Sequence, residues 1–295
     1  MDKPTIFSPE HANVGLFCDV FPPVMDGVSV CMENYAYWMQ KKVGGVAVVT
    51  PHVNGADYSV HDYKVFDYIS IPVPKRHPYV TGVAEIDPTY LAKIATTRFK
   101  ILHAHCPFAS GTTAMRIGRA QKIPVVATFH SKYRDDFARV LPKPVVDLVI
   151  DSIVDFYERA DLVWVPQESV VDVIREYGFK GHVEVMDNGS DLGADYPEKY
   201  FVEARQRLGV APEEFVMLFV GQHIWEKNPR LIIESLARLE DVPFRMYFVG
   251  VGYAAEEMKK LVSEKGLDNK VTFVGSITDR EKLTDLPFPI ILKLF

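Results

Sequence analysis

The sequence predicts an α/β protein made of two doubly wound units, and two observations carry this prediction. Apolar runs with little alternation recur along the chain, and most are followed by a helical pattern. This arrangement is typical of parallel strands that are covered on both faces. A second series of such pairs begins after a polar stretch, and 295 residues are enough for two domains of ordinary size. We therefore expect domains at residues 1–187 and 188–295.

The first unit is expected to alternate strands and helices over most of its length. Residues 51–87 are the exception and are expected to be irregular, with short extended pieces such as "YISIPV". Strands are expected at 13–20, 46–50, 99–105, 123–129, 161–166 and 182–186. Helices are expected at 29–42, 88–97, 110–121, 144–160 and 168–178.

The second unit repeats the pattern but is expected to be incomplete. Strands are expected at 215–221, 244–250 and 271–275, and helices at 229–240 and 254–266. A doubly wound domain commonly has about six strands. In the usual strand order, "FVMLFVG" would then form an open edge, an association hazard. The tail "PIILKLF" is expected to cover this edge only in part, because Pro287 and Pro289 cannot donate ladder hydrogen bonds.

Composition and net charge disfavour several classes of protein function. The net charge of −6 argues against a nucleic-acid binder, which normally carries a basic face. The three cysteines, Cys18, Cys31 and Cys106, show no metal-ligand spacing and indicate a reducing compartment. The N-terminus lacks the apolar core of a signal peptide, and no apolar run reaches the length of a membrane span. We expect a cytoplasmic protein without a Cys/His cluster or a metal.

A lysine precedes a well-marked helix start in "FVGQHIWEKNPRLIIESL". Asn228 and Pro229 are typical of an N-cap and a first helical residue. Lys227 therefore lies in a strand-to-helix turn, where free backbone N–H groups and the helix dipole already favour an anion. A cation at this point predicts that a phosphate or pyrophosphate binds there.

Glycines mark two other strand-to-helix loops. Gly27 in "FPPVMDGVSV" would let the backbone approach a ligand, although Asp26-Gly27 turn chemistry explains it equally well. Gly250-x-Gly252-x-x-Ala255 resembles the dinucleotide fingerprint. The next strand lacks an acid placed for a ribose, since Asp268 falls in a loop, so a dehydrogenase is disfavoured.

Histidines lie where two strands end, in "LHAHCPF" and "ATFHSKYRDDF". Ligands of open α/β sheets bind at the carboxyl ends of strands. We expect the side chains of His103 and His105 to point to opposite faces, which makes one of them structural. His130 is the better candidate, because a neutral imidazole there could hydrogen-bond a hydroxylated substrate.

Two charged features are expected to be solvated surface. Asp147, Asp151 and Asp155 form an acidic stripe along one helix, without a second set of metal ligands. The stripe would repel anionic lipid, so we do not assign this helix to a membrane. "PKRH" at 74–77 is a small basic loop that could also meet an acidic acceptor.

The order of eight motifs resembles the family 4 retaining glycosyltransferases, from about residue 13 to residue 286. They are "FPPVMDGVSV", "LHAHCPF", "IPVVATFHSKY", "ADLVWVPQ", "DNGSDL", "VGQHIWEKN", "FVGVG" and "VTFVGSITDREKL". Bacterial members that act on diacylglycerol, or on mannose-containing acceptors, are most similar. The resemblance implies the GT-B fold, with two Rossmann-like doubly wound domains, the second incomplete here.

The resemblance also implies an activity and a set of roles. A hexose would pass with retention from a nucleotide sugar, UDP- or GDP-linked, to a lipid or glycan acceptor, with possible peripheral membrane contact. The C-terminal domain would hold the donor and the N-terminal domain the acceptor, without a metal or other cofactor. The implied donor-binding residues are Gly27, Gln222, Lys227, Gly252 and Ile277, and the implied catalytic residue is His130.

Two departures from the family pattern are visible. Gln222 stands where the family usually has a cationic arginine, and neighbouring His223 is expected to compensate. The chain also ends before the family's paired-glutamate motif, so we expect it to be C-terminally truncated. Two alternatives to transfer stay open: a non-catalytic nucleotide- or glycan-binding remnant, and a nucleotide-sugar epimerase.

Overall fold

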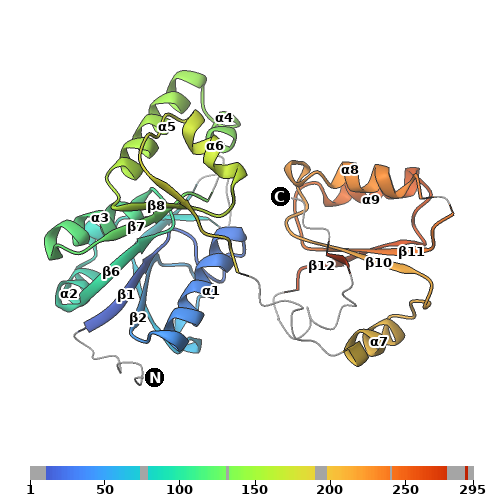
Figure 1. The fold of residues 1–295 in the computed structure, drawn as a ribbon, viewed down its shortest axis with the longest axis horizontal. Helices are drawn as coiled ribbons and strands as arrows, with labels where there is room; N and C mark the ends of the chain where they lie inside the picture. Colours follow the sequence, from blue (N-terminus) through green and yellow to red (C-terminus); the bar gives the residue numbers. More distant parts are fainter. Residues whose placement is uncertain are drawn as a thin grey trace. The chain divides into compact units, whose positions relative to one another are not determined.

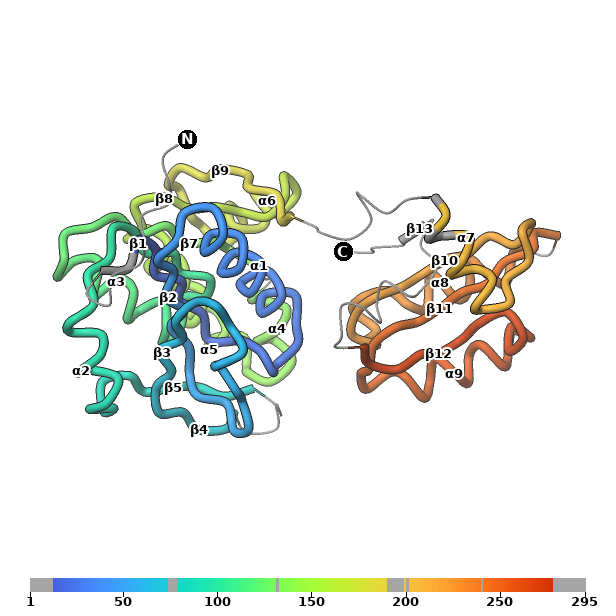
Figure 2. Tube along the Cα trace, turned by 90° about the horizontal axis from the view of Figure 1, so that it is seen from below, coloured from blue at the N-terminus to red at the C-terminus, as the bar shows by residue number. Residues whose placement is uncertain are grey.

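The computed structural model describes residues 11–73, 79–130, 133–189, 198–239, 241–277 and 290–291. The chain divides into two compact units, Met1–Gly189 and Ser190–Phe295 (Figures 1 and 2). Each unit has its own sheet and its own apolar core, so each is described by itself.

The first unit is built on a seven-stranded sheet in the order β3-β2-β1-β6-β7-β8-β9. Every neighbouring pair in it is parallel. The strands are β1 His11–Phe17, β2 Val46–Pro51, β3 Lys64–Tyr68, β6 Arg98–Ala104, β7 Val125–Thr128, β8 Leu162–Val165 and β9 Val183–Val185. Two short strands, β4 Ser70–Pro72 and β5 Val80–Gly82, form an antiparallel pair. The strand order reverses between β1 and β6, which places the ligand-binding switch point of such a sheet there.

Helices cover both faces of this sheet. They are α1 Gly27–Lys42, α2 Pro88–Thr96, α3 Ala109–Gln121, α4 Tyr133–Ala138, α5 Lys143–Glu158 and α6 Ser169–Glu176. One core contains buried residues of α2, α3 and α5, such as Tyr90, Ala114 and Ile150. A second core packs Met32 and Ala36 of α1 against the opposite face of β1. Figure 1 accordingly shows α1 and α3 on opposite sides of the strands.

The second unit has a parallel sheet in the order β12-β11-β10-β13. Its strands are β10 Phe215–Val220, β11 Phe244–Val249, β12 Val271–Gly275 and β13 Ile290–Ile291. Its helices are α7 Glu198–Arg207, α8 Pro229–Leu236 and α9 Ala255–Glu264. The main core joins α8 and α9 to one face of the sheet, and Figure 1 shows α7 on the other side.

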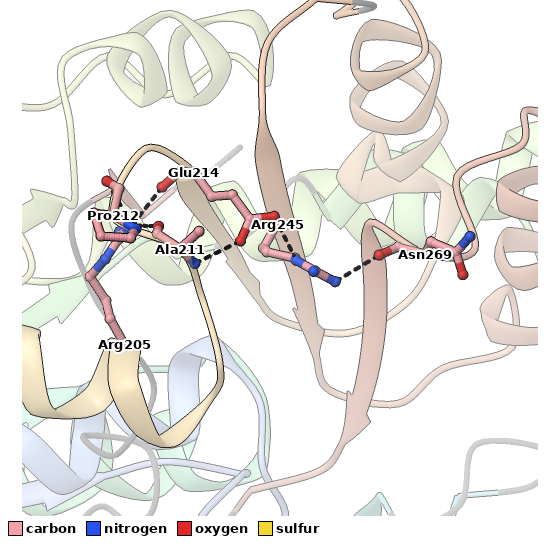
Figure 3. Close-up of polar contacts among 6 residues, drawn as sticks. All are labelled: Arg205, Ala211, Pro212, Glu214, Arg245 and Asn269. Carbon is pink, nitrogen blue, oxygen red and sulfur yellow. Dashed lines mark hydrogen bonds and ion pairs between the residues drawn. The ribbon is translucent and has the colours of Figure 1, made fainter.

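A polar network ties the amino-terminal ends of β10 and β11 together (Figure 3). Arg205 on α7 donates through Nη2 to the carbonyl oxygens of Ala211 and Glu214, at 2.5 and 2.8 Å. The Glu214 carboxylate accepts from Arg245 Nε at 2.9 Å. Arg245 Nη1 then donates to the carbonyl of Asn269 at 2.7 Å. The network holds α7 and the amino-terminal ends of the strands together. The loops at the carboxyl ends therefore extend from a sheet whose strands are fixed at their other end.

Several elements differ from the sequence-based expectations. Residues 64–68 form β3, which the sequence does not predict because "KVFDY" is a half-exposed edge strand with two charged residues. Helix α7 is missed because it is largely polar, and α4 because it is short and contains Asp135 and Asp136. By contrast, the tail covers the β10 edge in part, as expected, because β13 pairs with Met217 and Leu218 out of the six residues of β10.

Candidate functional site

The candidate site residues of the first unit lie at the carboxyl ends of β1, β6 and β7. The loop after β1 leads into α1, whose first turn is capped by Asp26 Oδ1, which accepts from Ser29 N at 2.8 Å. This confirms turn and cap chemistry for Asp26. At Gly27 an added Cβ would meet no heavy atom of the described chain within 4 Å. The space beside Gly27 is therefore open, as a backbone approach to a ligand requires, and the glycine's role in binding stays a prediction.

Three histidines meet at the carboxyl ends of β6 and β7. His103 and His105 are 3% and 0% exposed, and their ring centroids lie 4.0 Å apart. His130 is half-buried, and its Nε2 lies 3.1 Å from His105 Nδ1. The expectation that His103 and His105 point to opposite faces is wrong, because residues two apart along an extended chain share a face.

Burial keeps these imidazoles neutral. It lowers the pKa of His103 to about 3, with a further contribution from His130. Burial also lowers the pKa of His130 to about 4 and that of His105 well below its ordinary value. His103 is held by Thr128 Oγ1 at 2.7 Å, which marks it as structural. His130 can therefore hydrogen-bond a substrate hydroxyl but carries no charge near neutral pH.

A cysteine from α1 completes this group. One ligand atom from each of Cys31, His105 and His130 lies within 4.8 Å of the others. The expectation of no Cys/His cluster is wrong. The three residues lie far apart in the sequence, and the fold brings them together. The Cys31 thiol donates to Asn188 Oδ1 at 3.1 Å, and burial raises its pKa to about 12.

Asp19, two residues beyond the end of β1, is a buried acid near these strand ends that the sequence analysis did not single out. It is 9% exposed, and its Oδ1 accepts from Ser110 N at 3.1 Å. Its Oδ2 has no hydrogen-bond partner among the described residues. Burial raises the pKa of Asp19 to about 6. An acid directly after the apolar run "NVGLFC" was the available signal.

In the second unit the loop after β10 carries Gln222 and Lys227. Lys227 ends a 3₁₀ turn, Trp225–Lys227, immediately before α8. It is exposed, and its side chain makes no hydrogen bond or ion pair with the part of the chain that the structure describes. Asn228 occupies the N-cap position with φ 52°, but its side chain makes no capping bond to described residues. The N–H groups at the start of α8 thus lack a side-chain cap there and lie next to an exposed cation.

The loop after β10 is locked to the loop after β11 through backbone contacts. His223 N donates to Val251 O at 2.9 Å, and Ala254 N donates to His223 O at 3.0 Å. An added Cβ at Gly252 would lie 2.3 Å from His223 O. Close backbone packing therefore requires Gly252, which is a structural reason for the glycine pattern; contact of Gly252 with a donor stays a prediction.

His223 does not supply the charge that Gln222 lacks. The side chain is 1% exposed and packs among the rings of Phe219, Phe248 and Phe273. Burial lowers its pKa, with a smaller contribution from Lys259, so the imidazole is neutral. The expected compensation is therefore wrong, and His223 is a core residue of the second unit.

The remaining candidates are distributed more widely. Ile277, beyond β12, is half-buried and packs against a small apolar cluster that includes Leu218 and Val249. The acidic stripe on α5 is solvated surface, with Asp147 paired to Arg134 and Asp155 paired to Arg159. The basic loop at 74–77 lies outside the described residues. In the described chain, no helix is long and apolar enough to cross a membrane.

Two family descriptions match the chain, one over each unit. Glycosyltransferase Family 4 matches residues 25–193, and Glycosyl transferases group 1 matches residues 201–286. The alpha-monoglucosyldiacylglycerol synthase of Streptococcus pneumoniae (strain ATCC BAA-255 / R6) is 25% identical over 289 residues. That match covers 91% of this chain and 62% of the relative. The enzyme of the same name from Acholeplasma laidlawii is 21% identical, with 91% and 71% covered.

Solved glycosyltransferase structures share the fold. Anabaena Alr3699/HepE in complex with UDP and glucose superposes with a TM-score of 0.69 at 17% identity, covering 95% of this chain and 73% of that one. Sucrose-phosphate synthase from Thermosynechococcus elongatus gives 0.66 at 18% identity, covering 93% and 72%. These similarities confirm the predicted α/β fold of the GT-B class.

Proposed function

Because the chain belongs to Glycosyltransferase Family 4, we propose that it transfers a hexose from a nucleotide sugar to a lipid or glycan acceptor with retention. The observation that carries the proposal is the match of both units to glycosyltransferase families, over residues 25–193 and 201–286. Two relatives are named for a glucosylated diacylglycerol product, which favours a lipid acceptor and a glucosyl donor.

In this proposal the second unit holds the donor. Lys227 and the uncapped start of α8 contact the diphosphate, where a cation and backbone N–H groups stabilise the negative charge that leaves with it. Gln222 donates hydrogen bonds but no charge, so Lys227 carries most of the electrostatic attraction. The backbones around Gly252 and Ile277 lie at the carboxyl ends of β11 and β12, where the nucleoside would bind.

The first unit binds the acceptor and contributes His130 and Gly27. Neutral His130 hydrogen-bonds the transferred sugar and orients it, and the open space beside Gly27 admits the donor phosphates to the start of α1. The acceptor hydroxyl attacks the anomeric carbon from the face that the diphosphate leaves. The C–O bond to the diphosphate breaks, and the acceptor proton passes to a departing phosphate oxygen. Residues of this chain supply the stabilisation, so the proposal invokes no metal or other cofactor.

A lipid acceptor also implies peripheral contact with a membrane, which we propose for the end of α1. Tyr37 and Trp38 are 39% and 42% exposed, and Lys41 Nζ lies over both rings at 5.4 and 5.1 Å. Exposed aromatic rings beside lysines are typical of the bilayer interface. Trp38→Ser should reduce sedimentation with anionic vesicles, whereas Leu231→Ser on α8 should not. The cytoplasmic location stays a prediction.

Product analysis tests the proposed function. The chain is incubated with UDP- and GDP-hexoses and with diacylglycerol vesicles or soluble glycans, and the products are separated and identified. We expect a glycosylated acceptor whose anomeric configuration equals that of the donor, as determined by NMR. An isomerised nucleotide sugar would instead indicate an epimerase. Nucleotide binding without transfer would indicate a non-catalytic binder, and an inverted product would exclude retention.

A further inference from the structure

We propose that Cys31, His105 and His130 form a binding site for a divalent transition-metal ion of the zinc class. One ligand atom of each residue lies within 4.8 Å of the other two. His105 Nδ1 and His130 Nε2 are 3.1 Å apart. A tetrahedral zinc ion with Zn–N near 2.0–2.1 Å and Zn–S near 2.3 Å has an N–N edge of about 3.3 Å and an N–S edge of about 3.6 Å. The N–N separation is already close to the tetrahedral value, and the separations of the Cys31 sulfur from the two nitrogens, at most 4.8 Å, would have to shorten to about 3.6 Å.

The ligand set selects the class of ion. A thiol and two imidazoles suit zinc, copper and cobalt, whereas magnesium and calcium prefer oxygen ligands. Three protein ligands leave a fourth position for water or another small ligand. The three residues come from α1 and from the loops after β6 and β7, so the fold fixes their positions independently. The backbone of His105 is held in place, because its amide N–H donates to the carbonyl oxygen of Phe17 at 2.8 Å.

The surroundings provide what an ion needs. The ligand atom of His105 in this site is Nδ1, which now shares a hydrogen bond with His130 Nε2 at 3.1 Å, so an ion bound between the two nitrogens would replace that hydrogen bond. Binding replaces the S–H bond of Cys31 with a sulfur–metal bond and releases the proton to solvent. The amide of Asn188, which now accepts from the thiol, can rotate and donate N–H to the thiolate. His130 is half-buried, which leaves a side from which an ion can enter.

The site would have a consequence for activity, and this part rests on the proposed function. An ion on His130 would withdraw that imidazole from the transferred sugar. Zinc-class ions should therefore inhibit transfer, and a chelator should restore it. The binding experiment below does not use activity, so failure of the proposed function and failure of the metal site are distinguishable.

Cobalt(II) titration of the tag-free chain tests the site. We expect one cobalt ion per chain, with a near-ultraviolet thiolate-to-cobalt band and the visible bands of tetrahedral cobalt, all removed by zinc. Cys31→Ala should abolish the thiolate band. His130→Ala should weaken binding by more than about 100-fold, beyond the 10–100-fold effect of losing an outer-shell partner. Cys18→Ala, a fully buried cysteine outside the cluster, should leave the spectrum unchanged.

Other outcomes would overturn the proposal. They are the absence of a thiolate band in the parent chain, its persistence in Cys31→Ala, and its loss in Cys18→Ala with Cys31 intact. Circular dichroism of each variant verifies its fold. If Cys31→Ala does not fold, the variant at half-buried His130, His130→Ala, decides, because cobalt binding as tight as in the parent chain would exclude the site.

Discussion

The two units expose the carboxyl ends of their sheets in different ways. In the first unit the strand ends are lined by buried neutral groups, with His103 and His105 at 3% and 0% exposure. In the second unit the corresponding loop exposes the cation Lys227, while backbone hydrogen bonds between the loops after β10 and β11 hold it in place. One candidate site is therefore built from core side chains, and the other from a backbone scaffold that carries the exposed side chain of Lys227.

This difference indicates at which residues a substitution can change activity without changing stability. A side chain that fills a core contributes to both, so its substitution lowers stability and activity together. A side chain that projects from a braced loop can be removed with little change in stability. The second unit should thus tolerate substitution at Lys227, whereas the first unit should be sensitive at each buried histidine.

The largest expected effect is at His130, which lies between these extremes because it is half-buried. His130→Ala should lower turnover by about 10²–10³-fold, the range for loss of one preorganised donor. It should lower the free energy of unfolding by only about 1 kcal/mol, because the bond to His105 is lost. Kinetics and urea unfolding of the same preparation measure both. A collapse of the melting temperature would assign His130 to the core.

Lys227→Ala should weaken nucleoside-diphosphate binding by about 1.5–3 kcal/mol, the range for charge-assisted hydrogen bonds. Its melting temperature should not change, because Lys227 is exposed and unpaired among the described residues. Calorimetric titration with UDP and GDP measures the loss, and Lys260→Ala on the exposed surface of α9 is the matched control. Equal affinity of parent and Lys227→Ala for every nucleotide that the chain binds would exclude the phosphate role.

Two glycines give a matched pair across the units. Gly252→Ala should destabilise the second unit by about 1–3 kcal/mol, because the new Cβ would lie 2.3 Å from His223 O. Gly27→Ala should leave the first unit's stability unchanged or slightly raised, since Cβ meets no described heavy atom within 4 Å. It should nevertheless weaken donor binding. Unfolding curves and nucleotide titrations of both variants test this, and the reverse ranking of stabilities would refute the assignment.

The sequence predicts the alternating elements well because buried parallel strands produce continuous apolar runs. It does not predict β3, whose residues are half-exposed, whereas it does predict partial cover of the β10 edge by the tail, two residues of which pair with that strand. Lys227 and His130 are singled out as candidates from their places beside strands and helices, and their roles stay predictions. The cluster of Cys31 with two histidines and the burial of His223 depend on contacts between distant segments, and no local pattern reports these.

The smallest expected effect concerns Asp19. Its protonation should make the stability of the first unit, but not that of the second, depend on pH. The pKa of Asp19 is raised to about 6 by burial, above its value in the unfolded chain. The folded protein therefore binds more protons between these two values, and stability falls as the pH rises through about 4 to 6. Between pH 5 and 7 the loss should be about 1 kcal/mol.

In Asp19→Asn, which keeps an oxygen for Ser110 N, this part of the pH dependence should vanish. Hydrogen exchange should show the difference in β1 and β6 but not in β10 and β11. A difference between parent and variant that does not change with pH would contradict the role of burial.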